Sequence, residues 1–284
     1  MKVAPIILLL TISSSLLTPA YADEDHEALR ECVYSFQYVD HLESAMCFQS
    51  LADDGSIIAH RHLAVHYLYG LGVFQDIEKG TWHLIYAANN GNVESQLSLA
   101  QHYESGVKHK GVVIFDKDTT KAIHWYKIAA DNGSATAQHT LGNYYIKGVS
   151  VIKDVDYGVN LLEQSANSNF RRSQVALGEL FSTGDCVEKD VYRAIYWYRM
   201  AAMQYDIDSQ FALGRLYVEE CGATHNLALG YMWLNIASEQ NHRQAKIYRD
   251  RVAKEMTPAQ IAEAEFLSSK YKNLIARRPL TPPM

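Results

Sequence analysis

Residues 122–133, with the sequence AIHWYKIAADNG, contain the motif that decides the fold. An alanine is followed after two residues by Trp-Tyr, after two more by Ala-Ala, and after a further two by glycine. The position of the final glycine recurs at intervals of 36, 42, 36, 36 and 36 residues, at Gly55, Gly91, Gly133, Asn169, Tyr205 and Asn241. Self-similarity at a period of this length predicts a solenoid of stacked repeats, one of which carries six extra residues.

A second pattern precedes the first in each unit and consists of a small residue, a leucine and an aromatic residue at steps of four. Steps of four place these side chains on one face of a helix. Successive units carry the pattern at Ala59, Leu63, Tyr67; Ser95, Leu99, Tyr103; Ala137, Leu141, Tyr145; Ser173, Leu177, Phe181; and Ser209, Leu213, Tyr217.

A third ladder lies between the two halves of each unit, four residues before the small residue that opens the second half. Asp and Asn cap helix N-termini because their side chains accept hydrogen bonds from free backbone N–H groups. Each unit is therefore expected to be a helix, a glycine turn and a capped helix. The ladder consists of Asp76, Asp118, Asp154, Asp190 and Asn226.

The 36-residue period together with these motifs resembles the Sel1-like repeat (SLR) family, a relative of the tetratricopeptide repeats, over residues 28–250. The resemblance implies an all-α fold, a right-handed α/α solenoid of stacked helix-turn-helix repeats. Some units depart from the pattern at the Trp-Tyr position, which is occupied by Cys47-Phe48, His83-Leu84 and Leu161-Leu162.

The predicted organisation begins with a secretory signal peptide at residues 1–22. Lys2 precedes an apolar run over residues 3–17, and Ala20-Tyr21-Ala22 supplies the small residues of a cleavage site after Ala22. The protein is thus expected in the periplasm or outside the cell, without a membrane span after cleavage. The remaining segments are a degenerate N-terminal hairpin (23–55), five repeats (56–242), C-terminal capping helices (243–275) and a Pro-rich tail (276–284).

The C-terminal cap is expected to end in a helix that Thr257 and Gln260 open as a capping box. Five side chains of this helix are predicted by their spacing to face the stack: Ile261, Ala264, Leu267, Tyr271 and Leu274. Such a helix would cover the core that an open solenoid end exposes.

Composition and charge exclude two classes of protein, namely disordered chains and basic proteins that bind nucleic acid. With 48% hydrophobic residues the chain can build a core, and 32 acidic against 26 basic residues give a net charge of −6, which disfavours nucleic acid as a partner. Export makes the four cysteines candidates for disulfides. Cys32 with Cys47 is the favoured pair, and a bond between Cys186 and Cys221 is left open.

The family resemblance implies an adaptor that binds a protein or peptide partner in the cell envelope or outside the cell, in some bacteria in contact with host cells. A stack of hairpins offers a concave groove whose side chains vary without disturbing the core. The apolar insertion after Lys110 offers a second contact site at Val113, unless it folds back onto the neighbouring helix. The groove candidates are the polar first-helix residues His62, His66, His102, Asn143, Glu179 and Arg215.

Two alternatives have chemical content. Some cysteine-rich SLR proteins are described as penicillin-binding or β-lactamase-like, and Ser-x-x-Lys occurs here at Ser105, Ser150 and Ser269, but the S-D-N and K-T-G elements of such enzymes are missing. His62 and His66, one helical turn apart, could hold a metal ion with His102 but lack a fourth ligand. We therefore expect no catalytic residue, no metal and no cofactor.

Overall fold

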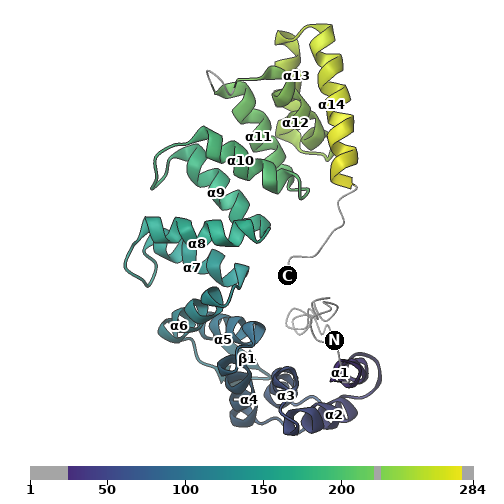
Figure 1. The fold of residues 1–284 in the computed structure, drawn as a ribbon, viewed down its shortest axis with the longest axis vertical. Helices are drawn as coiled ribbons and strands as arrows, with labels where there is room; N and C mark the ends of the chain where they lie inside the picture. Colours follow the sequence, from purple (N-terminus) through teal and green to yellow (C-terminus); the bar gives the residue numbers. More distant parts are fainter. Residues whose placement is uncertain (1–24, 221–224, 277–284) are drawn as a thin grey trace. The chain divides into compact units, whose positions relative to one another are not determined.

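The computed structural model describes residues 25–220 and 225–276, in which helices predominate and two short strands form a hairpin (Figure 1). The N-terminal elements are α1 (Asp25–Tyr34), the π-helix η3 (Ser35–Val39) and α2 (His41–Asp53). The first helices of the five repeats are α3 (Ile57–Tyr69), α5 (Val93–Ser105), α7 (Ala135–Lys147), α9 (Arg171–Thr183) and α11 (Ile207–Glu219). The second helices are α4 (Ile77–Asn89), α6 (Thr119–Asp131), α8 (Val155–Asn167), α10 (Val191–Ala202) and α12 (Leu227–Glu239).

The described chain forms two compact units that divide after Ala137. Unit 1 contains the N-terminal hairpin and the repeats of α3–α4 and α5–α6, together with the strands β1 (Val107–His109) and β2 (Val112–Phe115). Unit 2 contains α7 from Gln138 onward and all later helices, and it ends with α13 (Arg243–Val252), a 3-10 turn η4 (Ala253–Glu255) and α14 (Pro258–Ala276). Within both units the two helices of a repeat pack against each other, which confirms the predicted all-α solenoid fold.

The predicted capping ladder is confirmed at every position. The side-chain oxygens of Asp76, Asp118, Asp154, Asp190 and Asn226 accept hydrogen bonds of 2.9–3.0 Å from the backbone N–H three residues later. The first helices except α9, whose N-cap position holds Phe170, have side-chain caps too, and sequence analysis did not predict them. Asn92 and Asp206, for example, accept from Ser95 and Ser209 at 2.8 and 2.9 Å.

The closing turn of each unit explains why glycine recurs at that position. Gly55, Gly91 and Gly133 have φ angles of 94°, 89° and 86°, in the region that side chains with a Cβ rarely occupy. Asn169, Tyr205 and Asn241 replace glycine and retain positive φ angles of 64°, 63° and 67°. The turn geometry is therefore common to all units although its residue is not.

The core consists mainly of the leucine, alanine and aromatic residues of the two repeat motifs. Leu63, Leu99, Leu141, Leu177 and Leu213 are all buried, as are the large aromatic side chains Tyr126, Trp197 and Trp233. Between α7 and α8 in unit 2, a Cβ added at Gly158 would lie 2.7 Å from the carbonyl oxygen of Gly142. The backbones of α7 and α8 therefore come into contact at this crossing, because glycine has no side chain that would separate them.

A disulfide joins Cys32 of α1 to Cys47 of α2, with the Cα atoms 5.4 Å apart, as predicted. It ties together the two helices of the N-terminal hairpin, where Cys47 stands in place of the tryptophan of the repeat motif. By the chain-entropy model, a closed loop of this length contributes about 3 kcal/mol. Cys186 is exposed with a free thiol, while Cys221 lies outside the described residues, so their pairing stays a prediction.

The six-residue insertion forms the antiparallel hairpin β1–β2, which sequence analysis did not predict. Ile114 and Phe115 are buried, and the Phe115 ring lies 4.9 Å from the His102 ring. Val112 and Val113, with exposed fractions of 44% and 40%, face solvent. The insertion thus combines both expectations, since one end folds back and the other stays accessible.

The C-terminal helix α14 begins as predicted. Thr257 and Gln260 exchange hydrogen bonds in a capping box, and Ala264 is buried. The expectation for Leu274 was wrong, since its side chain is 51% exposed. The contacts of α14 with the rest of unit 2 run through the other four predicted residues, Ile261, Ala264, Leu267 and Tyr271.

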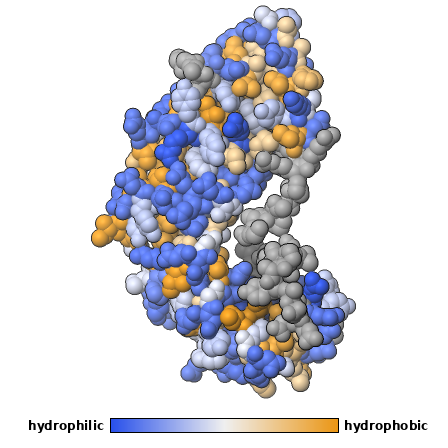
Figure 2. Space-filling model, in the orientation of Figure 1, coloured by the Kyte–Doolittle hydropathy of each residue, from blue (hydrophilic) through white to orange (hydrophobic). Residues whose placement is uncertain are grey.

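Among the described residues, no helix is both long and apolar enough to cross a membrane. Figure 2 shows mainly hydrophilic residues on the visible face, with hydrophobic side chains in separate small groups. The predicted signal peptide, residues 1–22, and the tail beyond Ala276 lie outside the described residues.

Candidate functional site

The first helices α7 and α9 of unit 2 form a hollow of about 720 Å³. Asn143 and Glu179, two of the residues predicted to face a groove, both line it. Neither side chain belongs to the small, leucine and aromatic positions of the first-helix motif. The hollow is completed by His139, Thr140, Tyr144, Lys147, Arg171, Arg172, Val175, Ala176 and Asp206.

The α7–α9 hollow has more cationic than anionic side chains. Arg171 pairs with Asp206, with Nε and Oδ2 3.6 Å apart, whereas Lys147 and Arg172 have no ion pair within the described part of the chain. Burial, together with the charges of Arg172 and Lys147, lowers the pKa of His139 to about 4. A neutral His139 leaves those two cations free to face an acidic or polar partner segment.

Unit 1 has a hollow at the equivalent place, between the first helices α3 and α5. Its volume is about 30 Å³, and Arg61, His62, Tyr69, Ser98 and His102 are among the residues that line it. Arg61 and His139 both lie two residues after the small residue that opens the first-helix pattern. The two hollows are thus repeat-equivalent, although one is open and the other almost closed.

The histidines predicted to face the groove are buried. His62, His66 and His102 have exposed fractions of 6%, 0% and 6%. The His62 ring stacks on Phe48 with centroids 4.4 Å apart, and burial lowers its pKa to about 3. His66 Nδ1 lies 2.7 Å from the carbonyl oxygen of Leu71. His62 and His66 thus fill space between α2 and α3 instead of offering a surface, and His102 on α5 packs against Phe115 of β2.

Arg215 is exposed but already has partners. Its Nη2 donates to Oε2 of Glu219 at 2.7 Å, and its guanidinium lies near the rings of Phe211 and Tyr248, at 5.8 and 5.6 Å. The hydrogen bond to Glu219 raises its pKa. The contacts of Arg215 therefore connect α11 with α13. Val113, the candidate on the β1–β2 hairpin, is accessible to solvent.

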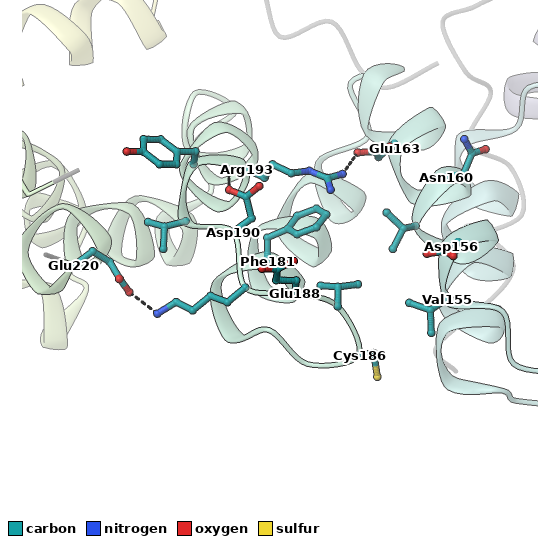
Figure 3. Close-up of a pocket in the computed structure, with 15 residues that line it drawn as sticks. Val155, Asp156, Asn160, Glu163, Phe181, Cys186, Glu188, Asp190, Arg193 and Glu220 are labelled. Carbon is teal, nitrogen blue, oxygen red and sulfur yellow. Dashed lines mark hydrogen bonds and ion pairs between the residues drawn. The ribbon is translucent and has the colours of Figure 1, made fainter. Parts of the chain in front are cut away.

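A third hollow, of about 920 Å³, lies between α8 and α10 and was missed by sequence analysis (Figure 3). Arg193 pairs with Glu163 and stacks over Phe181, while Lys189 pairs with Glu220 at 2.8 Å. Both cations of this hollow are thus neutralised by neighbouring carboxylates. The loop between α9 and α10, which sequence analysis interpreted only as a turn, closes one side of it.

The residues considered for chemistry are not arranged for it. Ser105 is the last residue of α5, Ser150 lies in the loop after α7, and Ser269 is inside α14, whereas a Ser-x-x-Lys nucleophile begins a helix. In the part of the chain that the structure describes, no three His, Cys, Asp or Glu side chains are grouped as metal ligands.

Stacked helical hairpins with an accessible first-helix face define a helical-repeat scaffold. The Sel1 repeat family matches five consecutive segments, residues 57–92, 93–134, 135–170, 171–206 and 207–242, and the chain belongs to this family. Sel1 repeats are generally scaffolds for interactions between proteins.

Several solved structures are similar to this chain, and two of them show the likeness well. A protective antigen present in uropathogenic Escherichia coli strains, which displays an SLR fold, is 28% identical, with a TM-score of 0.63 over 87% of this chain and 52% of that one. The chain thus spans about half the length of that antigen. A Sel1 repeat protein from Oxalobacter formigenes is 24% identical, with a TM-score of 0.58 over 80% of this chain and 92% of that one, and shows the same fold.

Proposed function

We propose that this protein is an exported scaffold that binds a segment of a partner protein in the α7–α9 hollow. One observation carries the proposal: this hollow is lined by polar and charged side chains that do not belong to the core positions of the repeat motifs. Two of these side chains, Lys147 and Arg172, lack ion-pair partners among the described residues. Exposed cations of this kind are solvated in the free protein, and they can pair with opposite charges of a partner when it binds.

Export is part of the proposal. The chain begins with a segment typical of a cleaved signal, and the disulfide between Cys32 and Cys47 needs an oxidising compartment. The similarity to a protective antigen of Escherichia coli also favours a place in the envelope or outside the cell. The scaffold would there assemble envelope or secreted complexes, or contact host cells.

The test is photo-crosslinking in the cells that naturally produce the protein. A photoreactive residue placed at Asn143 or Glu179 should capture one protein species, and the captured chain should begin at Asp23 after signal cleavage. The matched control is Asn167, which is exposed on the second helix α8 and lies outside the α7–α9 hollow.

Equal capture at Asn167 would contradict binding in the α7–α9 hollow. A chain that retains residues 1–22 inside the cell would contradict export. Capture at Val113 and not at Asn143 or Glu179 would move the binding surface to the β1–β2 hairpin.

A further inference from the structure

The α3–α5 hollow of unit 1 contains a buried imidazole without a partner. His102 is 6% exposed, and neither of its ring nitrogens has a hydrogen-bond partner within the described residues. Burial lowers the pKa of His102 to about 4, so at neutral pH the ring carries one N–H donor and one acceptor. Buried polar atoms in folded proteins are almost always paired, which points to a missing group beside this ring.

The same hollow contains a cation without a counterion. Arg61 makes no hydrogen bond or ion pair in the part of the chain that the structure describes, although the exposed carboxylate of Glu94 acts on it at longer range. Burial lowers the pKa of Arg61, but a guanidinium stays protonated at neutral pH. A desolvated and unpaired charge is costly, so this side chain too favours an added group.

Three kinds of group fit a space of about 30 Å³, which is close to the volume of one water molecule. A water would satisfy the imidazole of His102 but leave the charge of Arg61 unbalanced. A metal cation would be repelled by Arg61. A carboxylate group satisfies both, because it accepts the N–H of the imidazole and forms a strong charged hydrogen bond with the guanidinium.

We propose that the α3–α5 hollow binds one carboxylate group, supplied by an Asp or Glu side chain of the partner segment. The assignment of the carboxylate to a partner protein rests on the proposed scaffold function. Ser98, His62 and Tyr69 contribute further polar groups to the same hollow, and aliphatic side chains form the rest of its wall: Ala64, Val65, Leu68 and Leu84.

The charge at the equivalent place in unit 2 agrees with this proposal. The α7–α9 hollow carries Lys147, Arg171 and Arg172 against Glu179 and Asp206, in a chain whose net charge is −6. Both first-helix hollows thus contain unpaired cations on an acidic protein. An acidic partner segment would find complementary charge at each of them.

The experiment uses acetate as the probe and acetamide, its neutral isostere, as the control ligand. The exported full chain is labelled with ¹⁵N in its histidine rings, and each compound is titrated at pH 7 and constant ionic strength. The His102 signals, assigned with the variant His102→Gln, should shift saturably with acetate and not with acetamide. In Arg61→Met the acetate affinity should fall at least tenfold, and in Arg61→Lys it should fall less.

The matched control is Arg243→Met, which removes an exposed cation of α13 that lines neither first-helix hollow, and it should leave the acetate response of His102 unchanged. An equal response to acetamide, no saturable response, or an unchanged affinity in Arg61→Met would overturn the proposal. The signals of the remaining histidines report whether each variant is folded, and Arg61→Lys tests the charge if Arg61→Met unfolds.

Failure of this inference can be told apart from failure of the scaffold function. If Asn143 and Glu179 capture a partner while acetate does not bind, the carboxylate pocket is wrong and the scaffold stands. If acetate binds as expected but neither position captures a protein, the pocket stands and its occupant is a free carboxylate, which overturns the assignment to a partner segment.

Discussion

Lowering the pH from 7 to 5 should reduce the free energy of unfolding of unit 1 by about 4 kcal/mol from two histidines alone. The two are His62 and His102, whose pKa values burial lowers to about 3 and about 4. In the unfolded chain both return to the ordinary value of 6.5. His83, with a pKa lowered to about 4, acts in the same direction.

The sign follows from proton binding. Below pH 6.5 the unfolded chain binds protons at these histidines and the folded chain does not, so acid favours unfolding. The stability is fully present above that pH and is lost as the pH falls toward the folded pKa values. Between the ordinary pKa and pH 5, each histidine contributes about 2 kcal/mol to the loss.

Urea unfolding at pH 7 and pH 5, followed by circular dichroism, measures this effect. His62→Leu should reduce the difference between the two pH values by about 2 kcal/mol, whatever the variant costs at either pH alone. A wild-type urea midpoint that is the same at both pH values would contradict neutral, buried histidines. Most carboxylates stay ionised over this range and contribute little.

Trp233→Ala should destabilise the protein by about 3–5 kcal/mol, because it removes a large side chain from a closely packed core. Trp233 is 2% exposed in α12, and its ring lies 5.4 Å from that of Tyr271 in α14. The variant therefore also loosens the contact of the C-terminal helix. The same urea experiment at pH 7 measures the loss.

Trp82→Ala is the matched control, since Trp82 is 55% exposed and lies next to the ladder position, which is occupied by His83. Its ring stacks on Tyr86 at the surface, and its removal should cost about 1 kcal/mol or less. Similar losses for the two variants would show that the repeat motif does not mark the core.

The repeat period, the helix caps and the leucine ladder could be predicted because each depends on local sequence. Asp118 caps α6 through a backbone N–H three residues away, and Leu141 faces the core because of helical periodicity. The β1–β2 hairpin could not be predicted in this way. Its strands are fixed by contacts with the ends of α3 and α5, where His109 packs on Tyr69 and Phe115 on His102.

The candidate site was predicted in part, for a related reason. Asn143 and Glu179 line the same hollow, as their phase on α7 and α9 predicted. His62 and His66 are equivalent to Thr140 and Tyr144 of α7 and not to Asn143, and Phe48 and Ser44 of α2 pack against them. Helical phase predicts which residues share a face, whereas burial depends on the neighbouring helix, which a single repeat does not specify.

The central claim is that residues of the α7–α9 hollow bind the partner, while the leucine and aromatic residues of the repeat motifs stabilise the fold. The most direct test combines Asn143→Ala, Arg172→Ala and Glu179→Ala in one chain and measures its Kd for the captured partner and its urea midpoint. The account predicts binding at least about tenfold weaker with an unchanged midpoint. Unchanged binding, or a loss that only accompanies unfolding, would contradict it.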